Sequence, residues 1–347
     1  SVRTRDFHSL KSSSTLLWAT PQIHPIPEVG VRNGADLQIF LSVSVVSSMP
    51  MKLFNSICRR AVRQLGKWRM ISPKRTSVLL YRIAIGRSPD LDNPRDMNEK
   101  ILALSFGSDT SRWSVLADKY GVREELAAMG LGDILVPLYQ VADSADEMDF
   151  DSLPDSFVLK TTDGFSRTLV VRDKNKADLD GIRSTLRKWM KERSVGDEPH
   201  YSRIQRRIIA EKLLPAPEGF GPTDYKIICC NGEPLYCFVC SNRSMTTFKP
   251  DLKIYGLPDW RDLHGITEGL EGADVPPPVH LELMMKYSRL LAREFPLVRI
   301  DFYEVEDRVW FGEVTFTSSA GRMVELKQEL LTEIGDKVRM PGMENQI

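Results

Sequence analysis

Two acidic residues near the end of the chain lie inside otherwise apolar strand patterns. Asp301 interrupts the run 297–303, and Glu313 interrupts the run 309–316. A carboxylate removed from water is unfavourable unless a cation meets it. The two runs therefore predict either a surface hairpin with both acids in solvent or a buried polar site. Either way, they require an antiparallel hairpin whose two faces differ.

The register of this hairpin decides which side chains share a face. Side chains along a strand alternate between two faces, so Asp301 and Glu313 lie together only if the connecting loop has an odd number of residues. A three-residue loop over 306–308 pairs Val305 with Val309, Asp301 with Glu313, and Arg299 with Thr315. The apolar face then carries Val298, Ile300, Phe302, Trp310, Val314 and Phe316. We interpret the polar face as a Mg2+ and phosphate site.

Composition predicts an ordinary globular protein. The chain has 347 residues, of which 42% are hydrophobic and 27% charged, so we expect roughly two domains. A net charge of zero gives no bulk attraction to nucleic acid or membrane. The five cysteines do not resemble a secreted disulfide framework, which favours a reducing cytoplasm. Cys237 and Cys240 lack a second pair at metal-ligand spacing, so buried thiols are favoured over a zinc site.

The first 48 residues differ from the remainder. They are rich in Ser and Pro and show no sustained period, so we expect residues 1–48 to be a disordered or non-native leader. Met49 or Met51 is then the expected start. The apolar run 37–46 is far shorter than the ~20 residues that a spanning helix needs.

The segment after the leader is locally cationic. Residues 37–89 contain no Asp or Glu, whereas ten Lys and Arg fall within 52–87. Apolar residues recur there at helical spacing between the basic ones. Residues 52–75 are thus expected either to lie peripherally on an anionic membrane surface or to form a solvated basic helix packed on the domain.

Periodicity predicts mixed secondary structure for the rest of the chain. Helices are expected over 97–104, 113–117, 122–129, 178–191 and 281–293, and strands over 134–136, 157–160, 168–172, 207–211, 224–230 and 235–242. Asp96 followed by Glu99 predicts a capped helix start. An acidic linker is expected over 143–155 and a long polar loop over 244–278.

One strand ends in a lysine before a Gly-containing loop. The strand 157–160 ends at Lys160 and passes into the loop 161–166, after which a second strand begins. In such a hairpin the loop N–H groups fold over anionic oxygens while the ammonium lies beneath them, although a solvated lysine is the alternative. Lys226, flanked by strand residues, is a second candidate phosphate contact.

The order of these pieces resembles the ATP-grasp superfamily, and within it the TupA-like family associated with teichuronic acid and other surface polysaccharide biosynthesis. The matching stretches are Asn98-Glu99-Lys100-Ile101, Asp118-Lys119-Tyr120-Gly121-Val122-Arg123, Phe157-Val158-Leu159-Lys160, His200-Tyr201, Glu211, Asp224-Tyr225-Lys226, Val298-Arg299-Ile300-Asp301 and Phe311-Gly312-Glu313-Val314-Thr315-Phe316-Thr317. They are spread in order over about residues 90–325.

The resemblance implies an α+β, ATP-grasp fold. Two α+β subdomains would grip ATP between antiparallel sheets, with a helical region at the N-terminus. The expected divisions are the leader 1–48, a basic helical region 49–112, an ATP-grasp domain 113–325, and a C-terminal helix and tail 326–347.

The resemblance also implies roles for individual residues. ATP would contact Lys119, Lys160, Gly164, Ser166, Glu211, Lys212, Leu213 and Leu214; Mg2+ would be held by Asp301, Glu313 and Thr315; Arg299 and Lys226 would act on the transferring group. Thr315 stands where many members have a metal-binding Asn. Relatives tend to have a Gly-Ser-Gly loop where this chain has Asp163-Gly164-Phe165-Ser166, so we expect a triphosphate to approach this loop less easily.

Such a site suits a Mg-ATP-dependent carboxylate–amine ligase that works through an acyl phosphate. The expected substrates are a small molecule or a polysaccharide precursor rather than nucleic acid, and the expected location is the cytoplasm or the inner membrane surface. The alternatives are a glycosyltransferase-like or phosphotransferase role, and a degenerate nucleotide-binding protein. Asp301→Asn is expected to abolish ATP turnover with the fold intact. His200, His264 and His280 sit in no nucleophile motif and are expected to be satisfied structural residues.

Overall fold

The structure is a computed structural model that describes residues 50–164, 167–217, 220–241 and 251–341. The chain divides into two units, Ser1–Pro50 and Met51–Ile347, and the description below concerns the second. The predicted leader over 1–48 and the predicted ATP contact Ser166 lie outside the described residues.

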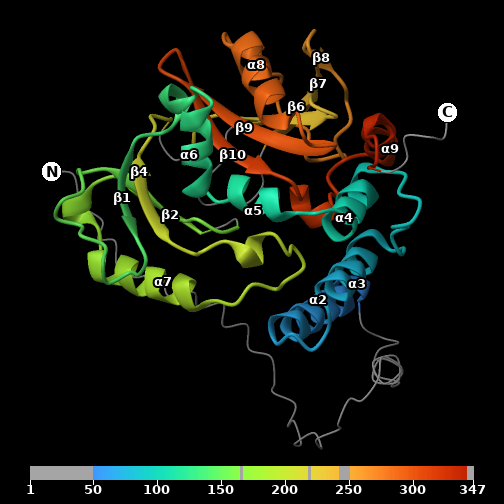
Figure 1. Ribbon diagram of the computed structural model, residues 1–347, viewed down its shortest axis with the longest axis horizontal. Coiled ribbons are helices and arrows are strands. Elements are labelled where there is room, and N and C mark those ends of the chain that lie inside the picture. The colour runs from blue at the N-terminus through green and yellow to red at the C-terminus, as the bar shows by residue number, and fades with distance from the viewer. Residues whose placement is uncertain (1–49, 165–166, 218–219, 242–250, 342–347) are drawn as a thin grey trace, which may run out of the picture. The chain divides into compact units, whose positions relative to one another are not determined.

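The described strands form two antiparallel sheets (Figure 1). The four-stranded sheet has the order β1 (Leu138–Ala142), β4 (Ile208–Lys212), β2 (Phe157–Thr161) and β3 (Thr168–Val171). The six-stranded sheet has the order β10 (Arg308–Thr315), β9 (Leu297–Val305), β5 (Asp224–Cys230), β6 (Glu233–Ser241), β7 (Asp251–Gly256) and β8 (Arg261–Asp262). With the helices, these sheets confirm the predicted α+β class.

The helices lie before, between and after the strands in sequence. The α-helices are α2 (Met51–Lys67), α3 (Pro73–Ile85), α4 (Met97–Gly107), α5 (Ser111–Leu116), α6 (Gly121–Ala128), α7 (Leu179–Lys191), α8 (Leu281–Ala292) and α9 (Gln328–Lys337). Short 3-10 helices are η2 (Gly132–Ile134), η3 (Lys174–Lys176), η4 (Tyr201–Arg203) and η5 (Ser318–Gly321). No described helix is long and apolar enough to cross a membrane.

Each sheet buries one apolar face under a helix. Helix α7 lies along the four-stranded sheet (Figure 1), where Leu186 packs in one cluster with Phe157 and Leu159. Helix α8 contacts β5, β6 and β9, and its Met284 belongs to the same core as Ile300. Because the helices take the apolar side chains, the polar side chains of these strands are left on the opposite faces.

The predicted start of α4 is confirmed in part. The Asp96 side chain accepts a hydrogen bond from Glu99 N at 2.9 Å, as an N-cap should. The Glu99 carboxylate does not complete the reciprocal cap, because it accepts from the backbone N–H groups of Arg95 and Asp90 and pairs with Arg87. These contacts fix the chain leading into α4.

The last hairpin keeps the predicted pairing by a different route. Its loop has two residues, Glu306 and Asp307, both with φ of 55°, so Val305 pairs with Arg308 rather than Val309. A β-bulge at Gly312 then restores the register that an even loop would lose. The intended pairs are present: Asp301 lies opposite Glu313, and Arg299 lies opposite Thr315.

The predicted apolar face of this hairpin was wrong at one position. Phe311, not Trp310, lies opposite Phe302 and joins the main core. Trp310 lies opposite Tyr303 on the other face. The shift follows from the shorter loop, since every residue between the turn and the bulge changes sides.

Two other predictions were wrong. The strand expected over 134–136 is reduced to an isolated β-bridge of Leu135 with Phe311, since Ile134 ends η2 and β1 begins only after Pro137. The long loop expected over 244–278 contains β7 and β8, because Ile254 and Tyr255 are buried in the main core and β7 pairs with β6. Residues 242–250 lie outside the described residues.

All five cysteines are free thiols, and the burial predicted for Cys237 and Cys240 is confirmed. Four of them are buried in the six-stranded sheet, including the Cys-x-x-Cys pair Cys237 and Cys240. Burial raises the pKa of Cys240 to about 11, which leaves its thiol protonated near neutral pH.

Candidate functional site

The polar face of β9 and β10 brings two carboxylates and a guanidinium together. Arg299 Nε donates to Asp301 Oδ1 at 2.6 Å, and Arg299 Nη2 donates to Glu313 Oε1 at 2.8 Å. The Thr315 hydroxyl donates to the same Glu313 oxygen at 2.8 Å and accepts from Arg299 Nη2 at 3.0 Å. Alternation along the two strands and the Gly312 bulge together produce this arrangement.

A lysine on β5 extends the same face. Lys226 lies opposite Asp301, and its Nζ is 2.5 Å from Asp301 Oδ2 and 2.5 Å from Asp224 Oδ2. Burial alone would lower the pKa of Lys226, but Asp224 and Asp301 raise it above its ordinary value. Lys226 therefore remains a cation between two carboxylates.

Glu313 remains an anion in this surrounding. Burial alone would raise its pKa, but Arg299, Lys119 and Lys226 lower it to about 2. Its side chain is 31% exposed, whereas that of Asp301 is 2% exposed. Glu313 is thus the carboxylate of the pair that solvent reaches.

The four-stranded sheet supplies the second half of the site. Lys160 Nζ lies 2.8 Å from Glu211 Oε2, and Arg123 Nη1 lies 3.1 Å from Glu211 Oε1. A pocket is lined by Lys119, Lys160 and Glu211, and by Phe311 and Gly312 of β10. The two sheets therefore meet around this pocket. The Glu211 carboxylate is already paired there with Lys160 and Arg123.

Lys119 lies under the β2–β3 loop. Its Nζ donates to Gly164 O at 2.5 Å, and its backbone N donates to Thr162 O at 3.1 Å. Burial lowers the pKa of Lys119, while Glu313 opposes that effect. The Lys119 ammonium is therefore held by the loop and lies within the electrostatic influence of Glu313 on β10.

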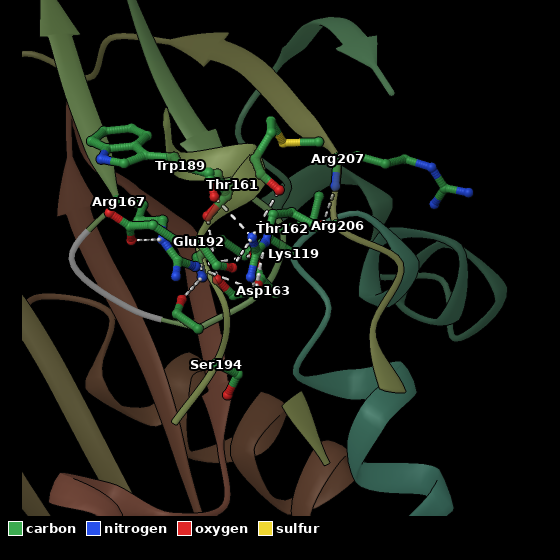
Figure 2. Close-up of polar contacts among 12 residues, drawn as sticks. Lys119, Thr161, Thr162, Asp163, Arg167, Trp189, Glu192, Ser194, Arg206 and Arg207 are labelled. Carbon is green, nitrogen blue, oxygen red and sulfur yellow. Dashed lines mark hydrogen bonds and ion pairs between the residues drawn. The ribbon is translucent and has the colours of Figure 1, made fainter. Parts of the chain in front are cut away.

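The acidic residue of this loop is neutralised by arginines. Figure 2 shows Asp163 between Arg167 and Arg206, with Arg206 Nη2 2.8 Å from Asp163 Oδ2. Arg206 Nη1 also donates to the carbonyl oxygens of Trp189 and Glu192, at 2.8 and 2.6 Å. The expectation that this loop hinders an approaching triphosphate also concerns Phe165, which lies outside the described residues. The charge of Asp163 is compensated by the two arginines, and Arg206 connects it to the end of α7.

A small apolar cluster lies beside Glu211. Leu214, Val136 and Trp310 are buried together, and Lys212 Nζ lies 5.8 Å from the Trp310 ring centroid. Lys212 N donates to Pro137 O at 2.9 Å. The cluster is an apolar environment next to β4, and apolar and aromatic side chains are the usual lining of a site for a heterocycle.

The oxygen donors fit a hard divalent cation. Asp301, Glu313 and Thr315 offer two carboxylates and a hydroxyl, the ligand types that Mg2+ prefers. Among described residues, the contacts recorded for Glu313 all use Oε1. A metal ion would therefore coordinate Glu313 Oε2 without displacing a contact within the protein.

Sequence reasoning missed several residues of this site. Asp224 shares a strand face with Lys226, so the period of two could have identified it. Arg123 pairs with Glu211, and Arg206 pairs with Asp163. The two members of each pair are far apart in sequence, so no local pattern indicates these contacts. Glu198 accepts from Thr317 Oγ1 at 2.5 Å, and burial together with Asp197 raises its pKa to about 7.

The predicted satisfied histidine is only half right. His200 is fully buried against Trp113, Tyr201 and Phe316, so its role is structural. Neither ring nitrogen of His200 has a hydrogen-bond partner among the residues that the structure describes. Burial lowers the pKa of His200 to about 3, so the ring is neutral.

A family model described as TupA-like ATPgrasp matches residues 99–339. No curated protein matches the chain. Among solved structures, D-alanine–D-alanine ligase from Bacillus anthracis complexed with ATP is 14% identical with a TM-score of 0.41, covering 70% of this chain and 72% of that one.

Two further solved structures resemble the chain. The ATP-grasp ligase PsnB complexed with a minimal precursor is 11% identical with a TM-score of 0.37, covering 67% of this chain and 62% of that one. An ADP complex of purK, N5-carboxyaminoimidazole ribonucleotide synthetase, is 13% identical with a TM-score of 0.36, covering 70% of this chain and 56% of that one. The chain thus spans less than two thirds of these two proteins.

Proposed function

Since the chain belongs to the TupA-like ATP-grasp family, we propose that it uses Mg-ATP to join a carboxylate to an amine. One observation carries this proposal: Asp301 and Glu313 lie opposite each other on β9 and β10, beside Arg299, and the neighbouring Gly312 lines one pocket together with Lys119 and Lys160. Paired acids with several buried cations are the groups that hold a metal-bound phosphate chain.

Each residue has a defined part in this proposal. Lys160 contacts the ATP phosphates from β2 of the four-stranded sheet, Lys119 contacts them from the segment between α5 and α6, and the loop at Gly164 contacts them as well. The adenine lies against the cluster of Leu214, Val136 and Trp310, bordered by Lys212 and Leu213. Asp301, Glu313 and Thr315 hold Mg2+, which when bound offsets negative charge on the phosphates.

The reaction follows from the chemistry of a carboxylate. A substrate carboxylate oxygen forms a bond to the γ-phosphorus of ATP, the bond between that phosphorus and the β–γ bridging oxygen breaks, and ADP leaves. The amine nitrogen then bonds to the acyl carbon, phosphate departs with the C–O electrons, and the amine gives up a proton to water. Arg299 and Lys226 stabilise the charge that develops on the transferred group.

Surface polysaccharide biosynthesis is the proposed setting, with an amino acid or a uronic acid as the carboxylate. The family supports this choice. A degenerate nucleotide-binding protein is the alternative suggested by the unusual loop. The pairing of Asp163 with Arg206 supports an active protein, because the loop's acidic charge is compensated.

Product analysis tests the proposal. Purified protein with Mg-ATP, candidate acids and candidate amines should release ADP and phosphate only when both organic substrates are present. AMP and pyrophosphate as products would exclude the mechanism. Asp301→Asn should lose at least a hundredfold in rate, in line with the loss of one preorganised charge. The control Asp307→Asn, at the exposed turn of the same hairpin, should keep full activity.

The structure indicates that Asp301→Asn also lowers the free energy of unfolding, which the sequence does not predict. Asp301 is 1% exposed and pairs with both Arg299 and Lys226. Removing its charge leaves two buried cations with one counterion fewer, which should reduce the free energy of unfolding by on the order of 3 kcal/mol. Unfolding must therefore be measured beside turnover, and Glu313→Gln, at a more exposed position, provides the second variant.

A further inference from the structure

Helix α2 carries an exposed apolar stripe in addition to the face that it buries. Leu53, Ile57 and Ala61 recur every four residues, which places them along one side of the helix. Leu53 is 51% exposed and Ile57 is 48% exposed. The residues that α2 buries, Val62 and Gly66, lie on a different side. The stripe is therefore not the packing face of the helix.

The turn after α2 extends the stripe. Trp68 comes directly after the last residue of α2, its N donates to Gln64 O at 3.0 Å as in a further helical turn, and its side chain is 59% exposed. Met70, two residues later, is 58% exposed. Large apolar side chains that cluster on one exposed surface mark an interaction site more often than single ones do.

The flank of the stripe is cationic. Lys52, Arg59, Arg60, Arg63 and Lys67 all belong to α2, which contains no acidic residue. Within the described part of the chain, none of the five forms an ion pair with a carboxylate. Their charge is consequently not compensated by any carboxylate among the described residues, and such a surface is the complement of an anionic one.

The packing of α2 on its neighbours holds this surface in place. A Cβ on Gly66 would lie 2.6 Å from Val195 O and 2.9 Å from Thr76 Cγ2, so the glycine allows α2 to pack tightly on α3 and on the segment before η4. As in the alternative considered from the sequence, α2 is a basic helix that packs on the domain. It packs through the side that carries Gly66 and not through the exposed stripe.

We propose that the exposed stripe of α2 and the turn 68–70 bind the surface of a membrane that contains anionic lipids, which goes beyond the proposed ligase chemistry. The helix lies in the plane of the interface. Leu53, Ile57, Trp68 and Met70 enter the boundary between headgroups and acyl chains, and the five cations contact lipid headgroups. A ligase held this way would meet substrates at the membrane surface.

Vesicle cosedimentation of the full chain without nucleotide tests the proposal. Binding is expected to vesicles of phosphatidylcholine mixed with phosphatidylglycerol, and much weaker binding to phosphatidylcholine alone. Arg59→Gln/Arg63→Gln should weaken binding about thirtyfold, because each basic residue near the surface contributes about 1 kcal/mol. The control Lys188→Gln/Lys191→Gln removes two exposed positive charges from α7 and should leave binding unchanged.

Leu53→Ser/Ile57→Ser separates insertion from charge. This variant keeps every cation and should lose binding at least tenfold while its thermal midpoint stays at the wild-type value, since both side chains are exposed. In wild-type protein, brominated lipids should quench Trp fluorescence, and Trp68→Phe should remove most of that quenching while binding is retained. Equal binding to neutral and anionic vesicles, or unchanged binding by both double variants, would overturn the proposal. Retention of RNA but not of vesicles would overturn it as well.

Discussion

Gly312 is the residue on which the geometry of the site depends most directly. A Cβ at this position would lie 3.0 Å from Asp301 O, 3.2 Å from Asp301 Cβ and 3.3 Å from Asp301 C. Asp301 belongs to β9, which is hydrogen-bonded to β10 on one side and β5 on the other, so its backbone has little freedom to retreat. Gly312→Ala should therefore push β10 away from β9 at the bulge and separate Asp301 from Glu313.

The expected magnitudes follow from that contact. Overpacking by one methyl group should lower the free energy of unfolding by about 1–3 kcal/mol. A displacement of the carboxylates by a few tenths of an ångström or more should lower ATP turnover by on the order of a hundredfold. Urea unfolding and ADP release measure the two effects on the same preparation.

Gly107 provides the matched control for this substitution. A Cβ there meets nothing within 4 Å, so Gly107→Ala should retain wild-type turnover and stability. If Gly312→Ala kept full ATP turnover and the wild-type dependence on Mg2+, the bulge would not be what aligns the two carboxylates, and the reasoning would be refuted.

Three further predictions concern the surrounding charges. Lys119→Met should weaken ATP binding at least tenfold in calorimetry, since its ammonium lies beneath the β2–β3 loop; equal affinity would remove it from the site. Asp163→Ala should lower the free energy of unfolding by about 2 kcal/mol in urea, because Arg206 loses its buried partner, and an unchanged midpoint would contradict this. The pKa of Glu313 is lower in the folded protein than its unfolded value near 4.5, so the carboxylate contributes stability above pH 4.5 that is lost as the pH falls toward 2. Between pH 4.5 and 2, the free energy of unfolding should therefore fall less in Glu313→Gln than in wild type, as measured by acid titration. Parallel curves for the two proteins would argue against the ion pair.

The pairing of the last hairpin was predictable, but its construction was not. Alternation placed Asp301 and Glu313 on one face only together with an assumed three-residue loop; with the two-residue loop that is present, the bulge at Gly312 brings them together. The two-residue turn carries Glu306-Asp307 in place of the Asn-Gly that usually announces such a turn, and the loop length was therefore misjudged. Gly312 within a strand was the available sign of a bulge.

Features that depend on distant parts of the chain were beyond local patterns. Strand β7 was taken for loop because its burial arises from pairing with β6 and not from its own composition. The contact of Asp163 with Arg206 joins residues 43 apart in sequence, and only the folded sheet brings them together. Helix α4, by contrast, was predicted correctly because its cap and its apolar residues are local.

The central claim is that the paired carboxylates bind Mg2+ together with ATP. Isothermal titration of ATP with and without Mg2+, on wild type, Glu313→Gln and the exposed-turn control Asp307→Asn, tests it most directly. Wild type and the control should bind ATP more tightly when Mg2+ is present, while Glu313→Gln should lose that increment with its thermal midpoint close to wild type. An identical Mg2+ effect in all three proteins would contradict the assignment of this face as the metal site.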